Sequence, residues 1–231
     1  MSTSRIEHPT VREDEPSLPS AIAGLHEAKG MLQKFAAAGK PHNDDTHEHC
    51  NRVGALAKEL ARAIGVDEDT CTLIDLSAPL HDIGKVRVPE SIRLKPDRFT
   101  PAERVIMEEH CKHGWDLIGQ GGIAQLFVAQ EIALNHHERW DGTGYPNGRR
   151  GNMIPLTARI TALADVFDAL THRRCYKEAW AVEDSLREIA SQRGKHFDPG
   201  LTDAFLKLVP RFLGQALAAK SHPGGHAISF A

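Results

Sequence analysis

The stretch HHERWDGTGYP, residues 136–146, joins two adjacent histidines to a loop rich in glycine. A second cluster, HDIGK at residues 81–85, lies upstream of it. Neutral imidazole is the commonest protein ligand for transition metals, and adjacent histidines suit a metal site better than an apolar core. Together the two stretches indicate a metal site. The plain alternative is a pair of surface histidines before a loop.

The segments around these stretches have the spacing of helices. Apolar residues recur at helical intervals from Val53 to Ile64, and Gly65 marks the end of that helix. The run TPAE at residues 100–103 predicts a helix start, because it combines an N-cap threonine, a proline at the first helical position and a capping-box glutamate. The helix that starts there is expected to carry His110 and His113. The full set of predicted helices covers about residues 21–38, 44–64, 68–81 with Pro79 bending the last turn, 100 onwards, 123–136, 156–170, 182–192 and 201–208.

No alternating strand pattern persists, so the chain is predicted to be an all-α domain. We expect a flexible leader at residues 1–20, a single domain at 21–220 with its core motifs at 45–198, and a flexible tail at 221–231. A long loop at residues 138–155 holds four glycines, three of them within residues 142–148. Loops of that length inside a domain are usually functional or disordered.

Composition excludes several classes of protein. The chain has 231 residues, is 41% hydrophobic and carries a formal net charge of -3, so it lacks the basic surface of a general DNA or RNA binder. A small anionic substrate stays compatible, because a bound metal supplies local positive charge. The apolar segments fall short of the ~18 residues that a membrane span needs, and residues 1–20 do not form a signal peptide. We therefore expect a cytoplasmic protein with its four cysteines reduced.

Several acidic and histidine residues stand at spacings that suit metal ligands. Asp45 and His49 are four residues apart and share one face of a predicted helix, where the alternative is a solvated first turn. The pair at residues 81–82 ends an apolar helix, so it is either a buried hydrogen bond or a site in which the Asp82 carboxylate bridges two cations. Asp165 and Asp168 lie one turn apart on an apolar helix, where charge needs a partner. Asp165 is the better ligand, and Asp168 is expected to hydrogen-bond within the fold.

The order of these motifs resembles that of the HD-GYP family, a branch of the HD phosphohydrolases whose members hydrolyse cyclic di-GMP. The resemblance covers about residues 45–198. It rests on HCNRV at 49–53, HDIGK at 81–85, His110 followed by Gly114, HHERWDGTGYP at 136–146, ADVFDALT at 164–171 and RCYK at 174–177.

The resemblance implies a helical bundle around a multinuclear metal centre, with iron or manganese as the divalent metal. His49, His81, Asp82 and Asp165 would hold one ion. Asp82, His110, His136 and His137 would hold the second, with Asp82 as the bridge. The resemblance also implies catalytic roles for Lys85 and Asp82, and contacts of Arg174 and Lys177 with the substrate phosphates. Asp45 stands where trinuclear members carry glutamate, and its shorter side chain favours two metals over three.

The implied function is metal-dependent hydrolysis of cyclic di-GMP to linear pGpG, with GMP after a second round. The alternatives are a cyclic dinucleotide-binding or protein-interaction module with little turnover, or an HD phosphohydrolase acting on another nucleotide. Every metal position expected of an active member is filled, which favours an enzyme. The loop residues Gly144, Tyr145 and Pro146 would cover the substrate or dock diguanylate cyclase (GGDEF) domains, or Tyr145 would simply pack the loop.

Overall fold

The computed structural model describes residues 47–119, 126–173 and 178–220, with only the backbone for residues 211–220. The predicted leader, the helix at 21–38 and the tail lie outside the described residues. The described elements are α2 (His47–Ala63), α3 (Glu68–Ser77), η1 (Ala78–Leu80), η2 (Ile83–Arg87), α4 (Glu90–Arg93), α5 (Pro101–Glu108), α6 (His110–Gly119), α7 (Phe127–Asn135), η4 (Gly151–Met153), α8 (Leu156–Thr171), α9 (Val182–Ser191) and α10 (Pro199–Lys220). They include no β-strand, which confirms the all-α prediction for this part of the chain.

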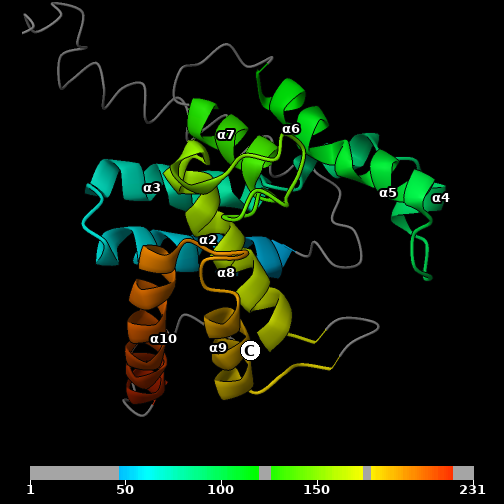
Figure 1. Cartoon of the computed structure of the whole chain (residues 1–231). Coiled ribbons are helices and arrows are strands. Elements are labelled where there is room, and N and C mark those ends of the chain that lie inside the picture. Colours follow the sequence, from blue (N-terminus) through cyan, green and yellow to red (C-terminus); the bar gives the residue numbers. More distant parts are fainter. Residues whose placement is uncertain (1–46, 120–125, 174–177, 221–231) are drawn as a thin grey trace, which may run out of the picture.

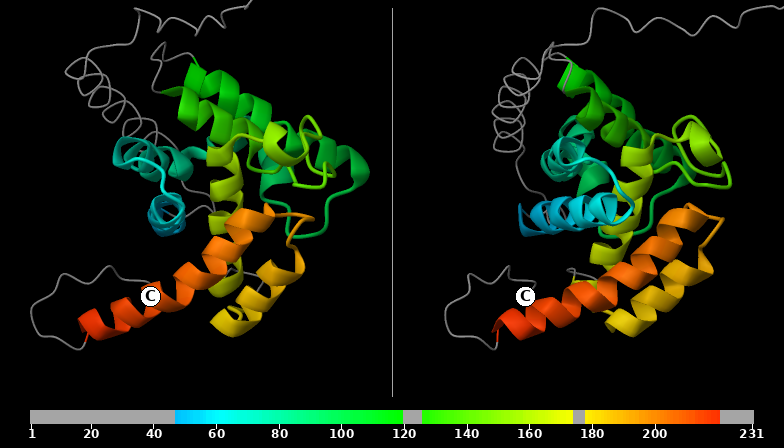
Figure 2. Two further views of the ribbon diagram at one scale, coloured as in Figure 1. Left: turned by 60° about the vertical axis from the view of Figure 1, so that its left-hand side comes forward. Right: turned by 90° about the vertical axis from the view of Figure 1, so that its left-hand side faces the viewer.

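Helix α8 runs through the middle of the bundle. It contacts α2 on one side, α7 toward one end and α9 and α10 toward the other, so it separates the α6–α7 pair from the α9–α10 pair (Figures 1 and 2). Helices α2 and α3 pack against each other beside it. None of the helices in the described ranges is both long and apolar enough to cross a membrane.

Two hydrophobic clusters stabilise this arrangement. The larger one joins α2, α3 and α8 to α9 and α10 through fully buried side chains such as Leu60, Leu163 and Phe205. The smaller one joins η1, α6 and α7 through Leu80, Ile118 and their neighbours. The apolar stripe predicted for α2 is buried in the larger cluster, where Val53, Leu56, Ala57 and Leu60 are at most 6% exposed.

Helix starts follow the expected capping rules. Thr100 accepts a hydrogen bond from the Glu103 backbone N–H, and the Glu103 carboxylate accepts one from the Thr100 N–H, which confirms the predicted capping box. The Asp67 side chain caps α3 by accepting from the Thr70 N–H.

Several predicted helices differ from the observed ones. Helix α3 ends at Ser77, and the last turn before His81 is the 3₁₀ segment η1, because Pro79 cannot continue an α-helical hydrogen-bond ladder. The single helix expected from residue 100 through His113 is wrong: α5 ends at Glu108, and α6 begins anew at His110. Helix α10 extends far beyond the predicted 201–208, with Pro210 inside it.

Gly84 allows η2 to lie directly on α6. A Cβ at this position would stand 1.9 Å from the His110 carbonyl oxygen and 2.5 Å from the Gly114 N, both of them backbone atoms. Because these atoms cannot move without moving α6, the glycine sets the distance between the two segments.

We expect Gly84→Ala to lower the free energy of unfolding by about 1–3 kcal/mol, the usual cost of overpacking. The matched control is Gly200→Ala in the first turn of α10, where the nearest atom to an added Cβ is a side-chain oxygen 3.4 Å away. That control is expected to be neutral or to stabilise by about 0.4–1 kcal/mol. Urea unfolding measures both; equal stability of Gly84→Ala and the parent chain would contradict the close-approach argument.

Candidate metal centre

The seven candidate ligands that the structure describes lie in two adjoining groups. Within each group the possible ligand atoms all lie within 4.8 Å of one another, so each group is able to hold a metal ion. The first group consists of His49, His81 and Asp165, and the second of Asp82, His110, His136 and His137. The eighth candidate, Asp45, lies outside the described residues.

Three of the histidines stand at helix ends and bond to a backbone carbonyl in the turn that precedes them. In each case ring Nδ1 lies close to the carbonyl oxygen three residues earlier in the chain. A carbonyl oxygen only accepts hydrogen bonds, so Nδ1 must carry the proton and Nε2 of the neutral ring keeps its lone pair. The bonds join His81 to Ala78 at 2.8 Å, His110 to Met107 at 2.7 Å and His136 to Ala133 at 3.1 Å.

The break between α5 and α6 contributes to this arrangement. His110 is the first residue of α6, and its ring reaches back to a carbonyl in the last turn of α5. His110 therefore stands at the junction of the two helices, and its Nε2 lies 3.2 Å from Asp82 Oδ1.

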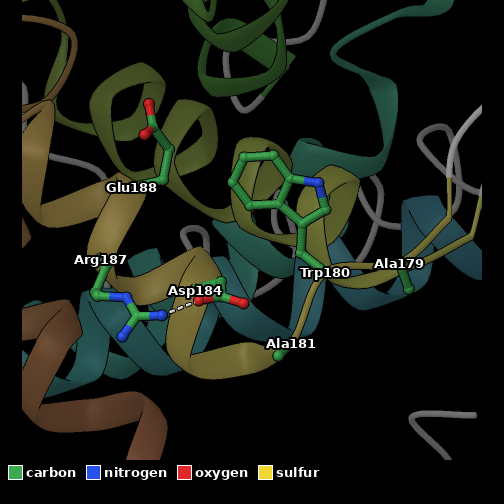
Figure 3. Close-up of a pocket in the computed structure, with 6 residues that line it drawn as sticks. All are labelled: Ala179, Trp180, Ala181, Asp184, Arg187 and Glu188. Atoms are coloured by element: carbon green, nitrogen blue, oxygen red, sulfur yellow. Dashed lines mark hydrogen bonds and ion pairs between the residues drawn. The ribbon is translucent and has the colours of Figure 1, made fainter.

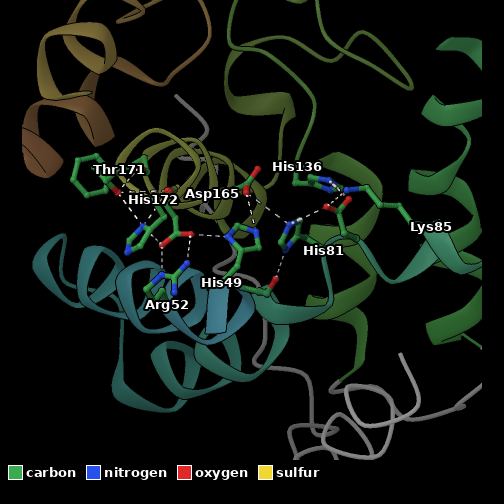
Figure 4. Close-up of polar contacts among 12 residues, drawn as sticks. His49, Arg52, His81, Lys85, His136, Asp165, Thr171 and His172 are labelled. Carbon is green, nitrogen blue, oxygen red and sulfur yellow. Dashed lines mark hydrogen bonds and ion pairs between the residues drawn. The ribbon is translucent and has the colours of Figure 1, made fainter. Parts of the chain in front are cut away.

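His49 is oriented by a carboxylate instead of a carbonyl. Its Nδ1 donates to Asp168 Oδ2 at 2.6 Å, and its Nε2 lies 3.4 Å from Asp165 Oδ1. Asp168 is itself buried and accepts bonds from the Arg52 guanidinium at 2.7 and 3.0 Å, while His172 Nδ1 lies 3.1 Å away (Figure 4). Asp168 therefore hydrogen-bonds within the fold, as expected, and does not join either group.

Buried polar atoms without hydrogen-bond partners mark the space between these side chains. His81 Nε2 and Asp82 Oδ1 are both inaccessible to solvent and make no hydrogen bond. His110 Nε2 lies 3.4 Å from His136 Nε2 and 3.2 Å from Asp82 Oδ1. Lone pairs that converge in this way need a cation or a proton between them. The donor set of imidazole nitrogens and carboxylate oxygens fits divalent transition metals.

Asp82 lies between the two groups. Its Oδ2 is 3.3 Å from His81 Nε2 in the first group, and its Oδ1 faces His110 in the second. One carboxylate with an oxygen toward each group has the geometry that bridging requires.

The first group concentrates opposite charges. Burial disfavours the charge on His81, but the carboxylates of Asp82 and Asp165 outweigh it and raise the pKa of His81 to about 9. Burial likewise opposes the charge on Asp165, but His49 and His81 outweigh it and lower the pKa of Asp165. Without cations this group therefore holds protons on its imidazoles, and metal binding would release them.

In the second group the pKa values of two imidazoles are lowered instead of raised. Burial lowers the pKa of His136 and outweighs the nearby Asp82 carboxylate. Burial lowers the pKa of His137 well below its ordinary value, and the neighbouring imidazoles of His136 and His110 lower it further. These rings are neutral near pH 7, which is the form that binds metals.

Lys85 lies beside the second group. Its Nζ is 2.5 Å from Asp82 Oδ2, and its side chain is 24% exposed, so the ammonium stands at the rim of the centre. Burial would raise the pKa of Asp82, but Lys85 and His81 outweigh it and hold that pKa well below its usual range. The predicted phosphate-binding residues Arg174 and Lys177 lie outside the described residues.

The glycine-rich loop folds back onto the second group. Glu138, which is 2% exposed, accepts hydrogen bonds from the backbone N–H groups of Asn147 at 2.8 Å and Arg149 at 2.9 Å. The sequence reasoning did not single out Glu138. Its position in the sequence could have indicated this role, because it is a carboxylate that directly follows two histidines and precedes a loop whose backbone N–H groups need acceptors.

The structure also contains a pocket away from both groups. This cavity of about 590 Å³ lies at the start of α9, and its one guanidinium, on Arg187, pairs with Asp184 (Figure 3). It is lined by Ala179, Trp180, Ala181, Asp184, Arg187 and Glu188, none of which belongs to either ligand group.

Comparisons with known proteins find a matching family model and several relatives. A family model described as HD domain matches residues 30–201. A cyclic di-GMP phosphodiesterase of Thermotoga maritima is 45% identical over 164 residues, which cover 71% of this chain and 45% of that protein. The 3′3′-cGAMP-specific phosphodiesterase 2 of Vibrio cholerae is 39% identical over 186 residues, which cover 80% of this chain and 36% of that protein. The chain thus spans less than half the length of these curated relatives.

A solved structure shares the fold. The crystal structure of a cyclic GMP-AMP specific phosphodiesterase of V. cholerae superimposes with a TM-score of 0.60 at 22% identity, covering 80% of this chain and 50% of that one. At that identity the likeness shows the arrangement of helices alone.

We expect Glu138→Gln to lower the free energy of unfolding by about 1.5–3 kcal/mol, because one of the two partly buried N–H groups that it binds loses a charged acceptor. Glu178→Gln serves as the control, since the Glu178 side chain is 82% exposed and pairs with Arg173, which is itself exposed. It should change stability by no more than about 0.5 kcal/mol. Chemical unfolding of both variants measures the difference, and an unchanged Glu138→Gln variant would contradict the loop clamp.

Proposed function

The chain belongs to the HD domain family, and from that premise we propose that it is a metal-dependent phosphodiesterase that hydrolyses cyclic di-GMP to linear pGpG. The observation that carries the proposal is the convergence of five imidazoles and two carboxylates into two adjoining groups. The activities named for the relatives support the substrate class, because both act on cyclic dinucleotides.

In the proposed centre the first group and Asp82 hold one divalent ion, and the second group holds the other. Iron is the proposed metal, with manganese as a substitute, since imidazole and carboxylate ligands suit both. Two such ions would neutralise charge on the scissile phosphate and lower the pKa of a water molecule towards about 7.

Charged side chains of the chain are proposed to hold the two metal ions together and to bind the phosphates of the substrate. Asp82, with one carboxylate oxygen toward each group, would fix the position of one metal site relative to the other. Lys85 places a positive charge beside the scissile phosphate and stabilises the negative charge that develops on the leaving oxygen. Arg174 and Lys177 are proposed to bind the phosphates of the substrate, as a fork donor and a point charge.

The proposed reaction adds water across one phosphodiester bond. The water oxygen bonds to phosphorus, the bond from phosphorus to the ribose 3′ oxygen breaks, and that oxygen leaves with a proton. The product is linear pGpG, and a second round at the remaining diester gives GMP. Docking of diguanylate cyclase domains on residues 144–146 and a cytoplasmic location stay predictions.

The first test is turnover. The metal-stripped full chain, reloaded anaerobically with Fe²⁺ or Mn²⁺, is expected to convert cyclic di-GMP to pGpG, with products separated by chromatography. A panel that includes 3′3′-cGAMP and cyclic di-AMP separates cyclic di-GMP specificity from a broader activity. Binding of cyclic di-GMP without turnover under either metal would favour the binding-module alternative and contradict the proposal.

A second test is metal stoichiometry. His49→Ala and His110→Ala remove ligands from different groups, so each variant is expected to retain about one ion where the parent chain retains two. Elemental analysis of the anaerobically purified chains measures this. Full retention of both ions in either variant would exclude that histidine as a ligand.

Lys85→Met is the matched control for that experiment. It removes a charge beside the centre but no ligand, so it should keep both ions while kcat falls by about 100- to 1000-fold, the usual cost of losing one stabilising donor. Loss of metal from this variant would show that Lys85 supports the ligands instead of the substrate.

A further inference from the structure

His137 differs from the other four imidazoles of the centre. Those of His49, His81, His110 and His136 are each oriented by a hydrogen bond from Nδ1 to a carboxylate or a carbonyl. Within the described chain, neither ring nitrogen of His137 makes a hydrogen bond. A metal-binding imidazole ordinarily needs such a partner to fix its plane.

The His137 ring instead contacts the rings of His136, Tyr145 and His110, the last of them edge-on with centroids 5.1 Å apart. Its centroid lies 4.1 Å from that of His136 and 4.7 Å from that of Tyr145, and the Tyr145 ring is tilted by only 30° to it. Tyr145 also meets His110 edge-on at 6.4 Å. The separations of Tyr145 from His137 and from His110 fall in the range of favourable aromatic contacts.

The loop fixes Tyr145 in this place by three independent restraints. A Cβ on Gly144 would lie 2.4–2.6 Å from backbone atoms of residues 137–139, so only glycine lets the loop come this close. The Tyr145 N–H donates to the His137 carbonyl oxygen at 3.2 Å. On the far side of Pro146, the Glu138 carboxylate holds the N–H groups of Asn147 and Arg149.

We propose that Tyr145 is a positioning residue for His137. Contact with the Tyr145 ring takes the place of the Nδ1 hydrogen bond that orients each of the other four imidazoles. This role rests on the proposed metal centre. Within that centre the loop holds the Tyr145 ring against a metal-binding imidazole. The phenol hydroxyl has no part in this role; the face of the ring does.

Manganese binding tests the proposal. The metal-stripped full chain is titrated with Mn²⁺, and the free ion is followed by electron paramagnetic resonance. Tyr145→Leu, which fills space without an aromatic ring, is expected to weaken one of two Mn²⁺ sites by about 10- to 100-fold and leave the other unchanged. The weakened site should be the one lost in His137→Ala. Tyr145→Phe, the matched control, should bind both ions as the parent chain does.

Three results would overturn the proposal: unchanged binding in Tyr145→Leu, equal weakening in Tyr145→Phe, or no second Mn²⁺ site in the parent chain. Far-UV circular dichroism and thermal unfolding of the metal-free variants separate a local effect from misfolding. If Tyr145→Leu does not fold, Tyr145→Met takes its place. The parent chain could bind two Mn²⁺ ions and still fail to hydrolyse cyclic di-GMP. Loss of one Mn²⁺ site in Tyr145→Leu would then support the role of Tyr145, while the missing turnover of the parent chain would contradict the proposed activity.

Discussion

The structure depends on the fixed orientation of four imidazole rings. A histidine at a helix end whose Nδ1 donates to a carbonyl three residues earlier has only one nitrogen left, and the lone pair of that nitrogen points away from the carbonyl. His81, His110 and His136 share this device, and His49 reaches the same result through Asp168. For these lone pairs to meet, the helix ends that carry the histidines must lie close together. The contacts among α2, α6, α7 and α8 bring them together at the metal centre.

Convergence of this kind would be costly without cations. Asp82 and Asp165 place two carboxylates among buried rings, and the first group balances them by holding protons on His81. Two bound metal ions would replace those protons and pair with the lone pairs of the second group. The arrangement is therefore understandable as a metal centre and difficult to explain as a polar core, because buried polar atoms otherwise find hydrogen-bond partners.

Much of this architecture could be predicted from the sequence. Helical spacing and the capping box at Thr100 locate most helices, and the order of the histidine motifs brings the ligand candidates into one set. The break at Glu109 could not be predicted, because no proline or glycine marks it. It accompanies the hydrogen bond of the His110 ring to the Met107 carbonyl oxygen, which only the structure shows. The partners of Asp168 and Glu138 likewise depend on residues brought together by the fold. The position of Tyr145 over His137 follows from loop geometry that the spacing of glycines does not specify.

X-ray absorption spectroscopy of the iron-loaded chain measures whether the two ligand groups hold two neighbouring metal ions. We expect iron coordinated by imidazole nitrogen and carboxylate oxygen, with a second iron at about 3.5–4 Å, the spacing of two-metal hydrolytic sites. A spectrum of isolated iron ions, with no metal–metal distance and no imidazole scattering, would contradict this expectation.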